Sequence, residues 1–242
     1  MSLEDWPWPE GTFLARLCPE SRRDLLKLGA QQYYAPGRTL VRHGADATSV
    51  YLLRSRDQTA SACVKISNAD EQLLAIRVSG DVIGELGALD PGSARSATAT
   101  VCTAAIAHCI PGEVFLAFLD AHADGWQVLC RTIADRLAWS DQRRLDFGEC
   151  PVHVRLARLL VEFAESHGRA ITLVRAPGDP EIAAREVTVR LSYKELGNLI
   201  GSRVDAIGRA MTTMRKAELA CLHNGHLVVL DLDGLREFGG LV

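Results

Sequence analysis

The stretch from 84 to 97, GELGALDPGSARSA, constrains this chain more than any other part of its sequence. It sets the carboxylate of Glu85 ahead of the guanidinium of Arg95, with a Pro-Gly turn between them. The runs Leu73–Val78 and Ala97–Val101 on either side are rich in aliphatic and β-branched residues, which indicates strands. The pattern therefore predicts two strands joined by a connection that carries one acid and one arginine.

Those two charged groups match the two polar parts of a nucleotide. An arginine can donate two parallel hydrogen bonds to a phosphate, which a lysine cannot copy. Glu85 would repel a phosphate but can accept a hydrogen bond from a sugar hydroxyl. We expect Glu85–Leu89 to form one helical turn, whose free N–H groups favour an anion. The stretch predicts a nucleotide site; the alternative is an exposed loop with an ion pair of little energetic weight.

The stretch also closely resembles the phosphate-binding cassette of the cyclic-nucleotide-binding domain of the catabolite-activator (CRP/FNR) superfamily of bacterial transcription regulators. The resemblance is carried by the GELGA run at 84–88 and the RSA run at 95–97. It implies that Glu85 holds the ribose 2′-hydroxyl and that Arg95 and Ser96 hold the cyclic phosphate. The backbone of Gly84 would lie against the sugar, and Leu86 would be a further nucleotide-binding residue.

Composition fits a small regulator and excludes several other classes. The chain has 242 residues, 48% of them hydrophobic, a formal net charge of −3 and seven cysteines without metal-ligand spacing. We therefore expect no metal and no iron–sulfur centre. The first residues lack a basic region before an apolar one, so we expect no export signal and a cytoplasmic protein. A nucleophile elbow, a P-loop, an HExxH pair and kinase motifs are all missing from the sequence, which predicts that the chain is not an enzyme.

Upstream of residue 112 the sequence predicts a small all-β domain. A helix interrupted at Cys18-Pro19 is expected over Thr12–Gln31, and short strand-like runs separated by turn signals follow from Tyr33 to Pro111. Their spacing favours an antiparallel barrel or jelly roll. The polar connection Arg54–Ala60 is longer than the resemblance leads one to expect, and it could reshape a wall of the nucleotide pocket.

The next segment predicts one long helix with a narrow apolar seam. Alternating steps of four and three residues join Trp126, Cys130, Ile133, Leu137, Ser140, Arg144 and Phe147. A seam of this kind is typical of a two-stranded coiled coil, so we expect a homodimer through the 126–147 helix. The alternative is an amphipathic helix packed on its own barrel, which usually has a wider stripe.

The same helix carries two candidate base-binding residues. By the resemblance, Ser140 and Asp141 take the places of a polar pair that reaches the purine, one residue serving each subunit's pocket. A hydroxyl is usual at both places, so Asp141 is a departure. A carboxylate there could accept from adenine N6 or guanine N2, or it could abolish the contact across subunits. Cyclic AMP is favoured as the effector, and cyclic GMP remains open.

Gly148–Pro151 breaks the helix, and a second domain is predicted after it. Ser192 and Glu195 form a capping-box pattern, Gly201 permits a sharp turn, and a second amphipathic helix follows. The pair Asn224-Gly225 then predicts a hairpin. The segment resembles the winged helix-turn-helix of the same superfamily; the alternative is a plain two-helix corner with solvated charges.

A local positive excess supports a DNA-binding face in a chain that is acidic overall. Between residues 190 and 216 there are six lysines and arginines against two acids: Arg190, Lys194, Arg203, Arg209, Arg215 and Lys216 against Glu195 and Asp205. By the resemblance, Arg209 and Asp205 take the places of recognition residues, while Val204 replaces a recognition arginine and Arg203 stands one position earlier. Ser192 is a further candidate DNA contact. The usual operator of the family cannot be assumed.

Together these features predict an α+β fold. They predict a cyclic-nucleotide-binding β-barrel or jelly roll over 1–124, a dimerisation helix and hinge over 125–150, and a winged helix-turn-helix over 151–242. The predicted function is a homodimeric transcription regulator controlled by a cyclic purine nucleotide. Its predicted partners are double-stranded DNA, a second copy of the chain and RNA polymerase, without a membrane. One alternative keeps the fold and DNA binding without a cyclic-nucleotide response. A more remote alternative is a nucleotide-regulated enzyme subunit.

Overall fold

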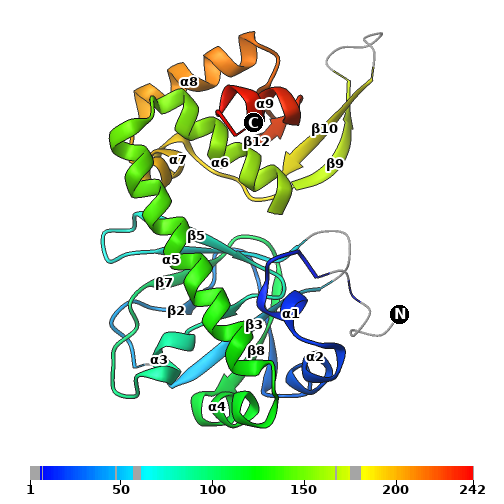
Figure 1. Cartoon of the computed structure of the whole chain (residues 1–242), viewed down its shortest axis with the longest axis vertical. Coiled ribbons are helices and arrows are strands. Elements are labelled where there is room, and N and C mark those ends of the chain that lie inside the picture. Colours follow the sequence, from blue (N-terminus) through cyan, green and yellow to red (C-terminus); the bar gives the residue numbers. More distant parts are fainter. Residues whose placement is uncertain are drawn as a thin grey trace. The chain divides into compact units, whose positions relative to one another are not determined.

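The computed structural model describes residues 6, 8–46, 48–56, 61–166, 168–174 and 181–241. These residues form two compact units, unit 1 over residues 1–139 and unit 2 over residues 140–242 (Figure 1). The connection Arg54–Ala60 lies only partly within the described residues.

Unit 1 is built on two four-stranded antiparallel sheets, with the strand orders β1-β8-β3-β6 and β2-β7-β4-β5. The strands are β1 (Ala30–Tyr34), β2 (Thr39–Val41), β3 (Ser49–Ser55), β4 (Cys63–Ser67), β5 (Leu73–Val78), β6 (Val82–Ile83), β7 (Thr98–Val101) and β8 (Ala105–Pro111). Buried side chains from both sheets, among them Leu53, Val64 and Val101, share one hydrophobic core. The predicted antiparallel β-domain is confirmed.

Helices cover the outer face of the first sheet. They are α1 (Phe13–Arg16), α2 (Pro19–Leu25), α4 (Gly112–Ala121) and the start of α5 (Gly125–Glu149). Phe13, Phe115 and Leu129 from these helices share a core with Val50 and Leu52 of β3. A further short helix of unit 1, α3 (Glu85–Leu89), is the helical turn expected from the sequence.

The helix expected over Thr12–Gln31 ends earlier than predicted. Ala30 and Gln31 belong to β1, where they pair with Cys109 and His108 of β8. Gly29 precedes them with a φ of +75°, and a Cβ at this glycine would lie 2.5 Å from the Cys109 carbonyl oxygen. Pairing with β8 therefore outweighs the local helical pattern, because it satisfies the backbone of an entire strand.

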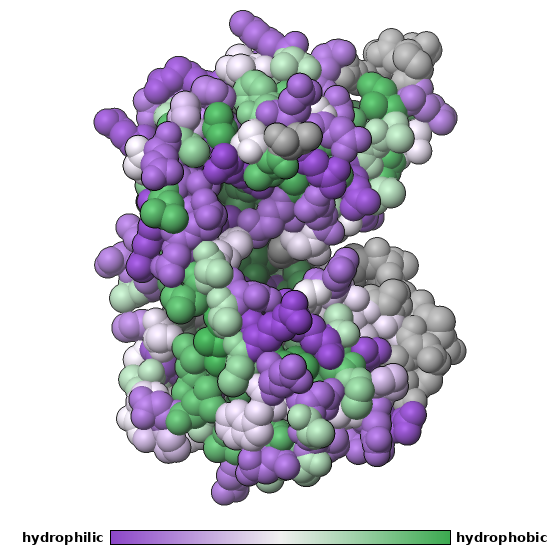
Figure 2. Space-filling view, in the orientation of Figure 1, coloured by the Kyte–Doolittle hydropathy of each residue, from purple (hydrophilic) through white to green (hydrophobic). Residues whose placement is uncertain are grey.

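One continuous helix, α5, begins in unit 1 and ends in unit 2. Val128 and Leu129 are buried in unit 1, whereas Trp126 and Leu137 are 38% and 61% exposed. Two of the predicted seam residues contact their own chain instead: Ile133 packs on the core of unit 1, and Phe147 lies under the Arg155 guanidinium. Figure 2 shows apolar residues gathered over the part of α5 that belongs to unit 1. Ile133 is therefore partly buried in its own unit, whereas Phe147 remains 41% exposed despite its contact with Arg155.

Unit 2 surrounds helix α6 (Val152–Ser166), which buries most of its apolar residues. The other helices are α7 (Tyr193–Ile200), α8 (Val204–Lys216) and α9 (Leu232–Phe238). The strands β9 (Gly168–Leu173), β10 (Ile182–Val187), β11 (Ala220–His223) and β12 (His226–Val229) form one sheet in the order β11-β12-β10-β9. The predicted hairpin at Asn224-Gly225 is confirmed, and pairing between β10 and β12 extends it into a four-stranded sheet.

Candidate functional site

A cavity of about 460 Å³ lies in unit 1 around the stretch that the sequence singled out. Its lining includes β5, β6, α3, the connection after α3, β7 and one side chain of α5. The residues that matter for its chemistry are Arg77, Gly84, Glu85, Leu86, Asp90, Ser93, Arg95, Ser96 and Arg136. A cavity of this volume is in the range that encloses a small ligand.

Gly84 and Arg95 form the most tightly built part of the cavity. Gly84 has a φ of +88°, in the left-handed region, and a Cβ on it would lie 2.1 Å from Arg95 Nη1. Only a glycine therefore allows the guanidinium to approach the backbone here. Arg95 Nη1 donates to the Gly84 carbonyl oxygen at 3.1 Å, and Nη2 donates to the Ser49 carbonyl oxygen.

The guanidinium of Arg95 is anchored without a carboxylate partner among the residues that the structure describes. Arg95 is only 7% exposed, and its two side-chain hydrogen bonds to described residues go to neutral carbonyls. Its own backbone N–H donates to the Ala45 carbonyl oxygen at 2.8 Å, which fixes the residue on the turn after β2. Five N–H donors and a full charge are more than two carbonyls satisfy, so this group can hold an anion.

Glu85 is buried beside it and is held by an arginine of α5. Glu85 is 6% exposed, and Arg136 Nη1 donates to its Oε1 at 2.7 Å. Arg136 Nη2 also lies 3.4 Å from Asp81 Oδ1 and donates to the Val82 carbonyl oxygen at 3.0 Å. A carboxylate has a second oxygen, so Glu85 can accept from a ligand hydroxyl while it stays paired.

In unit 2, α7 and α8 form a helix-turn-helix. The Ser192 hydroxyl accepts from the backbone N–H of Glu195, and the Glu195 carboxylate accepts from the backbone N–H of Ser192, which is the predicted capping box. Gly201 ends α7 with a φ of +61°. A Cβ on Gly197 would lie 2.5 Å from the Ser202 carbonyl oxygen, so a glycine is required inside α7 as well.

Four of the five candidate DNA-contacting residues lie in the first part of α8 or at its N-cap and face solvent, while the fifth, Ser192, is the exposed cap of α7. The side chains of Arg203, Asp205 and Arg209 are 91%, 59% and 73% exposed, and Val204 is 50% exposed. Arg209 Nη1 donates to Asp205 Oδ2 at 3.2 Å, and this bond holds the pKa of the Asp205 carboxyl below its usual value. Arg203 Nε lies 3.7 Å from the other oxygen of Asp205. All six positive residues predicted for this face are exposed.

Comparison with known families agrees with both halves of this description. Residues 31–122 match the model of the cyclic nucleotide-binding domain, and residues 154–238 match the model of the Crp-like helix-turn-helix domain. The chain belongs to the CRP/FNR family of transcription regulators. The resemblance stated from the sequence, and the α+β fold expected from it, are thereby confirmed.

Curated relatives of this CRP/FNR regulator include the cAMP-activated global transcriptional regulator CRP of Salmonella typhimurium. It is 22% identical over 196 residues, which cover 81% of this chain and 87% of the relative. The CRP-like cAMP-activated global transcriptional regulator of Mycobacterium tuberculosis is 25% identical over 205 residues, covering 83% of this chain and 84% of the relative. Both relatives are transcription regulators.

Solved structures share the fold of this CRP/FNR regulator at low identity. A CooA mutant from Carboxydothermus hydrogenoformans has a TM-score of 0.66 at 17% identity, over 89% of this chain and 90% of that chain. The c-di-GMP responsive global regulator CLP of Xanthomonas campestris has a TM-score of 0.63 at 18% identity, over 88% of this chain and 99% of that chain.

The structure brings together five of the seven residues predicted for nucleotide binding in this CRP/FNR regulator. Gly84, Glu85, Leu86, Arg95 and Ser96 all line the cavity. The remaining two, Ser140 and Asp141, lie on α5 in unit 2, one helical turn beyond Arg136. Asp141 is exposed, and its carboxylate lies 3.8 Å from Arg144. Their role toward a base stays a prediction.

Two arginines of the cavity escaped the sequence reasoning. Arg136 lines the cavity from α5 and Arg77 from β5. Arg77 interrupts an otherwise aliphatic run, which was a usable signal, because an arginine in such a strand needs either solvent or a polar cavity. Nothing in the local sequence distinguishes Arg136 from the exposed arginines of the same helix.

The described residues contain no group of three or more histidines, cysteines and acids that could hold a metal ion. Within the same residues, we find no helix with the length and apolar character that a bilayer crossing demands.

Proposed function

We propose that this chain is a homodimeric transcription regulator that binds double-stranded DNA through α8 and is controlled by a cyclic purine nucleotide bound in the cavity of unit 1. The observation that carries the proposal is the guanidinium of Arg95, which is 7% exposed, lines the cavity and is anchored only by two carbonyl oxygens. Such a group is prepared to bind a phosphate, because the cost of ordering it has already been met by the fold.

In this proposal each cavity residue takes the role that its chemistry allows. Arg95 and the exposed hydroxyl of Ser96 bind the cyclic phosphate, and Glu85 accepts from the ribose 2′-hydroxyl while Arg136 keeps it oriented. Gly84 gives the sugar access to the backbone. Ser140 and Asp141 of α5 are the candidates for the base. The curated relatives named cAMP-activated support a cyclic nucleotide as the effector.

The output of the proposed regulator is DNA binding by two copies of α8. Exposed Arg203 and Arg209 would reach base edges or phosphates, with Asp205 releasing Arg209 when DNA offers better acceptors. The exposed apolar residues Trp126 and Leu137 of α5 support pairing with a second copy. Nucleotide binding would then shift an existing equilibrium between two arrangements of the dimer, by no more than its difference in affinity for them.

Calorimetric titration of the full chain with cyclic AMP and cyclic GMP tests the sensor. We expect micromolar binding of at least one nucleotide, and a loss of about a hundredfold or more in Arg95→Ala. Arg38→Ala is the matched control, because Arg38 is an exposed arginine of the same unit outside the cavity lining. Absence of binding by a folded wild-type chain would contradict the proposal.

Selection of bound sequences from a random duplex library, followed by anisotropy measurements, tests the output. Arg209→Ala should weaken binding to the selected duplex by about tenfold without changing the unfolding temperature. Sedimentation should give a dimer for the wild type and a monomer for Leu137→Glu, whereas Leu222→Glu, at a 45% exposed position of β11, should remain a dimer. A monomeric wild type would refute the dimer.

A second candidate keeps the fold and the DNA binding but responds to a different effector. The similarity in fold to a regulator named as c-di-GMP responsive favours this candidate, because a shared fold does not fix the ligand. It predicts specific DNA binding that neither cyclic AMP nor cyclic GMP alters, which the same anisotropy measurement would detect.

A further inference from the structure

Of the three arginines and two acids that line the cavity of unit 1, only Arg136 and Glu85 form a close ion pair among the described residues. Three guanidinium groups line it, those of Arg77, Arg95 and Arg136. The two buried carboxylates nearby, Glu85 and Asp81, both lie against Arg136, at 2.7 Å and 3.4 Å. Arg136 is therefore compensated by the protein, and the other two arginines are left with neutral partners.

The proposed contacts to the phosphate and the sugar use Arg95, Glu85 and Arg136, and they do not involve Arg77. Its Nη1 donates to the carbonyl oxygen of Ile76 at 3.1 Å, and no carboxylate lies within ion-pairing distance of it among the described residues. Burial, reinforced by the positive charge of Arg136, lowers the pKa of Arg77 to about 10. The remaining N–H donors of this half-buried guanidinium form no ion pair with a described carboxylate, so a ligand in the cavity can accept hydrogen bonds from them.

The position of Arg77 indicates which part of a nucleotide would meet it. Arg95 sits against Gly84, while the charges that act on Arg77 are those of Arg136, Asp81 and Glu85. The Glu85 carboxylate is thus next in sequence to the residue that Arg95 contacts, and its charge acts on Arg77 across the same cavity. A nucleotide with its phosphate on Arg95 and its ribose on Glu85 would extend its base toward Arg77.

A guanidinium offers only donors, in a planar fork, so it distinguishes the two purines. Guanine presents two acceptors, N7 and O6, on the edge where adenine presents the acceptor N7 and the donor amino group N6. We infer that Arg77 reads the N7/O6 edge of guanine and that the cavity selects cyclic GMP over cyclic AMP. This inference rests on the proposed function, and it revises the preference for cyclic AMP drawn from the sequence.

A cavity of about 460 Å³ supports a mononucleotide as the occupant. A cyclic dinucleotide could instead place a second phosphate on Arg77, since a phosphate is also an acceptor for the guanidinium fork. Its binding is therefore one arm of the test.

The test is a calorimetric series on the full chain with cyclic GMP, cyclic IMP, cyclic AMP and cyclic di-GMP. Hypoxanthine keeps N7 and O6 but lacks the 2-amino group, so cyclic IMP isolates the edge that Arg77 is inferred to read. We expect cyclic GMP and cyclic IMP to bind at least about tenfold more tightly than cyclic AMP. In R77L that preference should disappear through a loss of affinity for cyclic GMP and cyclic IMP, whereas R38L should retain it.

Free R77L should be at least as resistant to thermal unfolding as the wild type, since the change removes a half-buried charge that makes no ion pair with a described carboxylate. A lower unfolding temperature would indicate a structural role for Arg77 and count against the inference. The ligand series on the wild type measures the preference between guanine and adenine without any variant. Equal or tighter binding of cyclic AMP, or an unchanged preference in folded R77L, would overturn the inference and leave the proposed function standing. Binding of cyclic di-GMP alone would overturn the choice of a mononucleotide. Binding of none of the four would overturn the inference and the proposed nucleotide control together.

Discussion

The cavity of unit 1 and the helix-turn-helix of unit 2 use the same residue types in opposite ways. Glu85 and Arg95 are 6% and 7% exposed and are fixed by backbone carbonyls and by Arg136. Asp205 and Arg209 are 59% and 73% exposed and hold each other across one turn of α8. In the cavity the fold has already removed the charges from water, so a ligand meets groups that are oriented and poorly solvated. On α8 the charged side chains remain solvated and screened, so they must change their contacts and lose water when DNA binds.

The largest contrast is expected from the same change, carboxylate to amide, made in each region. Glu85→Gln leaves the half-buried Arg136 with Asp81 as its remaining acid, and we expect a loss of about 2–4 kcal/mol in the free energy of unfolding. Asp205→Asn should leave the free energy of unfolding unchanged, because its partners Arg203 and Arg209 stay solvated. Urea unfolding of both variants checks this.

An equal loss of unfolding free energy in the two variants would contradict the expected difference between the pair in the cavity and the solvated pair on α8. A loss confined to Asp205→Asn would reverse it.

Alanine substitutions of glycines in α7 and α8 should give the next largest change in unfolding free energy, and they test how closely the backbone packs around each helix. Gly197→Ala places a Cβ within 2.5 Å of the Ser202 carbonyl oxygen, so backbone must shift, and we expect a loss of about 1–3 kcal/mol in unfolding free energy. Gly208→Ala meets only the Tyr193 ring at 3.7 Å and gains helix propensity, so it should be neutral or stabilising. Thermal unfolding followed by circular dichroism distinguishes them, and a destabilised Gly208→Ala would show that α8 approaches α7 more closely than described.

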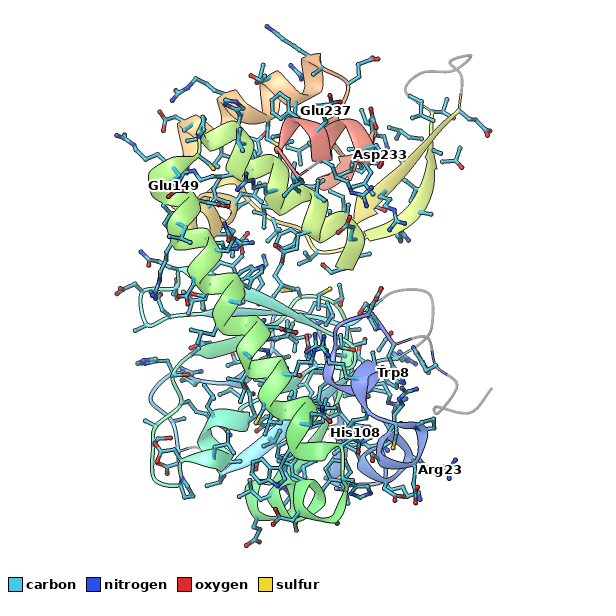
Figure 3. All side chains as sticks on the ribbon, in the orientation of Figure 1. Trp8, Arg23, His108, Glu149, Asp233 and Glu237 are labelled. Atoms are coloured by element: carbon cyan, nitrogen blue, oxygen red, sulfur yellow. The ribbon has the colours of Figure 1, made fainter. Side chains whose placement is uncertain are left out.

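The smallest effect concerns pH and two histidines of unit 1. Burial lowers the pKa of His108, against the pull of the Leu28 carbonyl and with added repulsion from Arg54. His108 lies inside unit 1 on β8, with no exposed surface (Figure 3). His108 therefore binds a proton near pH 6.5 in the unfolded chain but stays neutral at that pH in the folded chain. The free energy of unfolding falls as pH drops through that value.

His122 has the opposite sign. The carbonyl oxygen of Phe118 raises the pKa of His122, with Asp24 adding to the shift. Its contribution is fully present below pH 6.5 and is lost as pH rises through the higher folded pKa. Unfolding measured from pH 5 to pH 8 should show a shallower decline toward acid in His108→Gln and a steeper one in His122→Gln. Equal slopes in both variants would contradict the assignment.

Much of the molecule could be predicted from its sequence, because the deciding signals were local. The cap of α7 by Ser192, the turn at Gly201 and the hairpin at Asn224-Gly225 each depend on neighbouring residues alone. The alternating strands of unit 1 depend on short-range periodicity in the same way. The helix expected through Gln31 failed for the complementary reason: β1 is stabilised by β8, a strand that lies far along the chain.

The sequence by itself predicted that the stretch from 84 to 97 contributes to a nucleotide site. Gly84, Glu85 and Arg95 are close in the chain, and their side chains and backbone together suit a nucleotide. Tertiary structure alone decided that Arg136 from α5 pairs with Glu85, and that Arg77 from β5 lines the same cavity without an ion pair to a described residue. The reason is physical. Compensation of a buried charge depends on distance and solvent exclusion, and both are set by elements that meet only after the chain has folded.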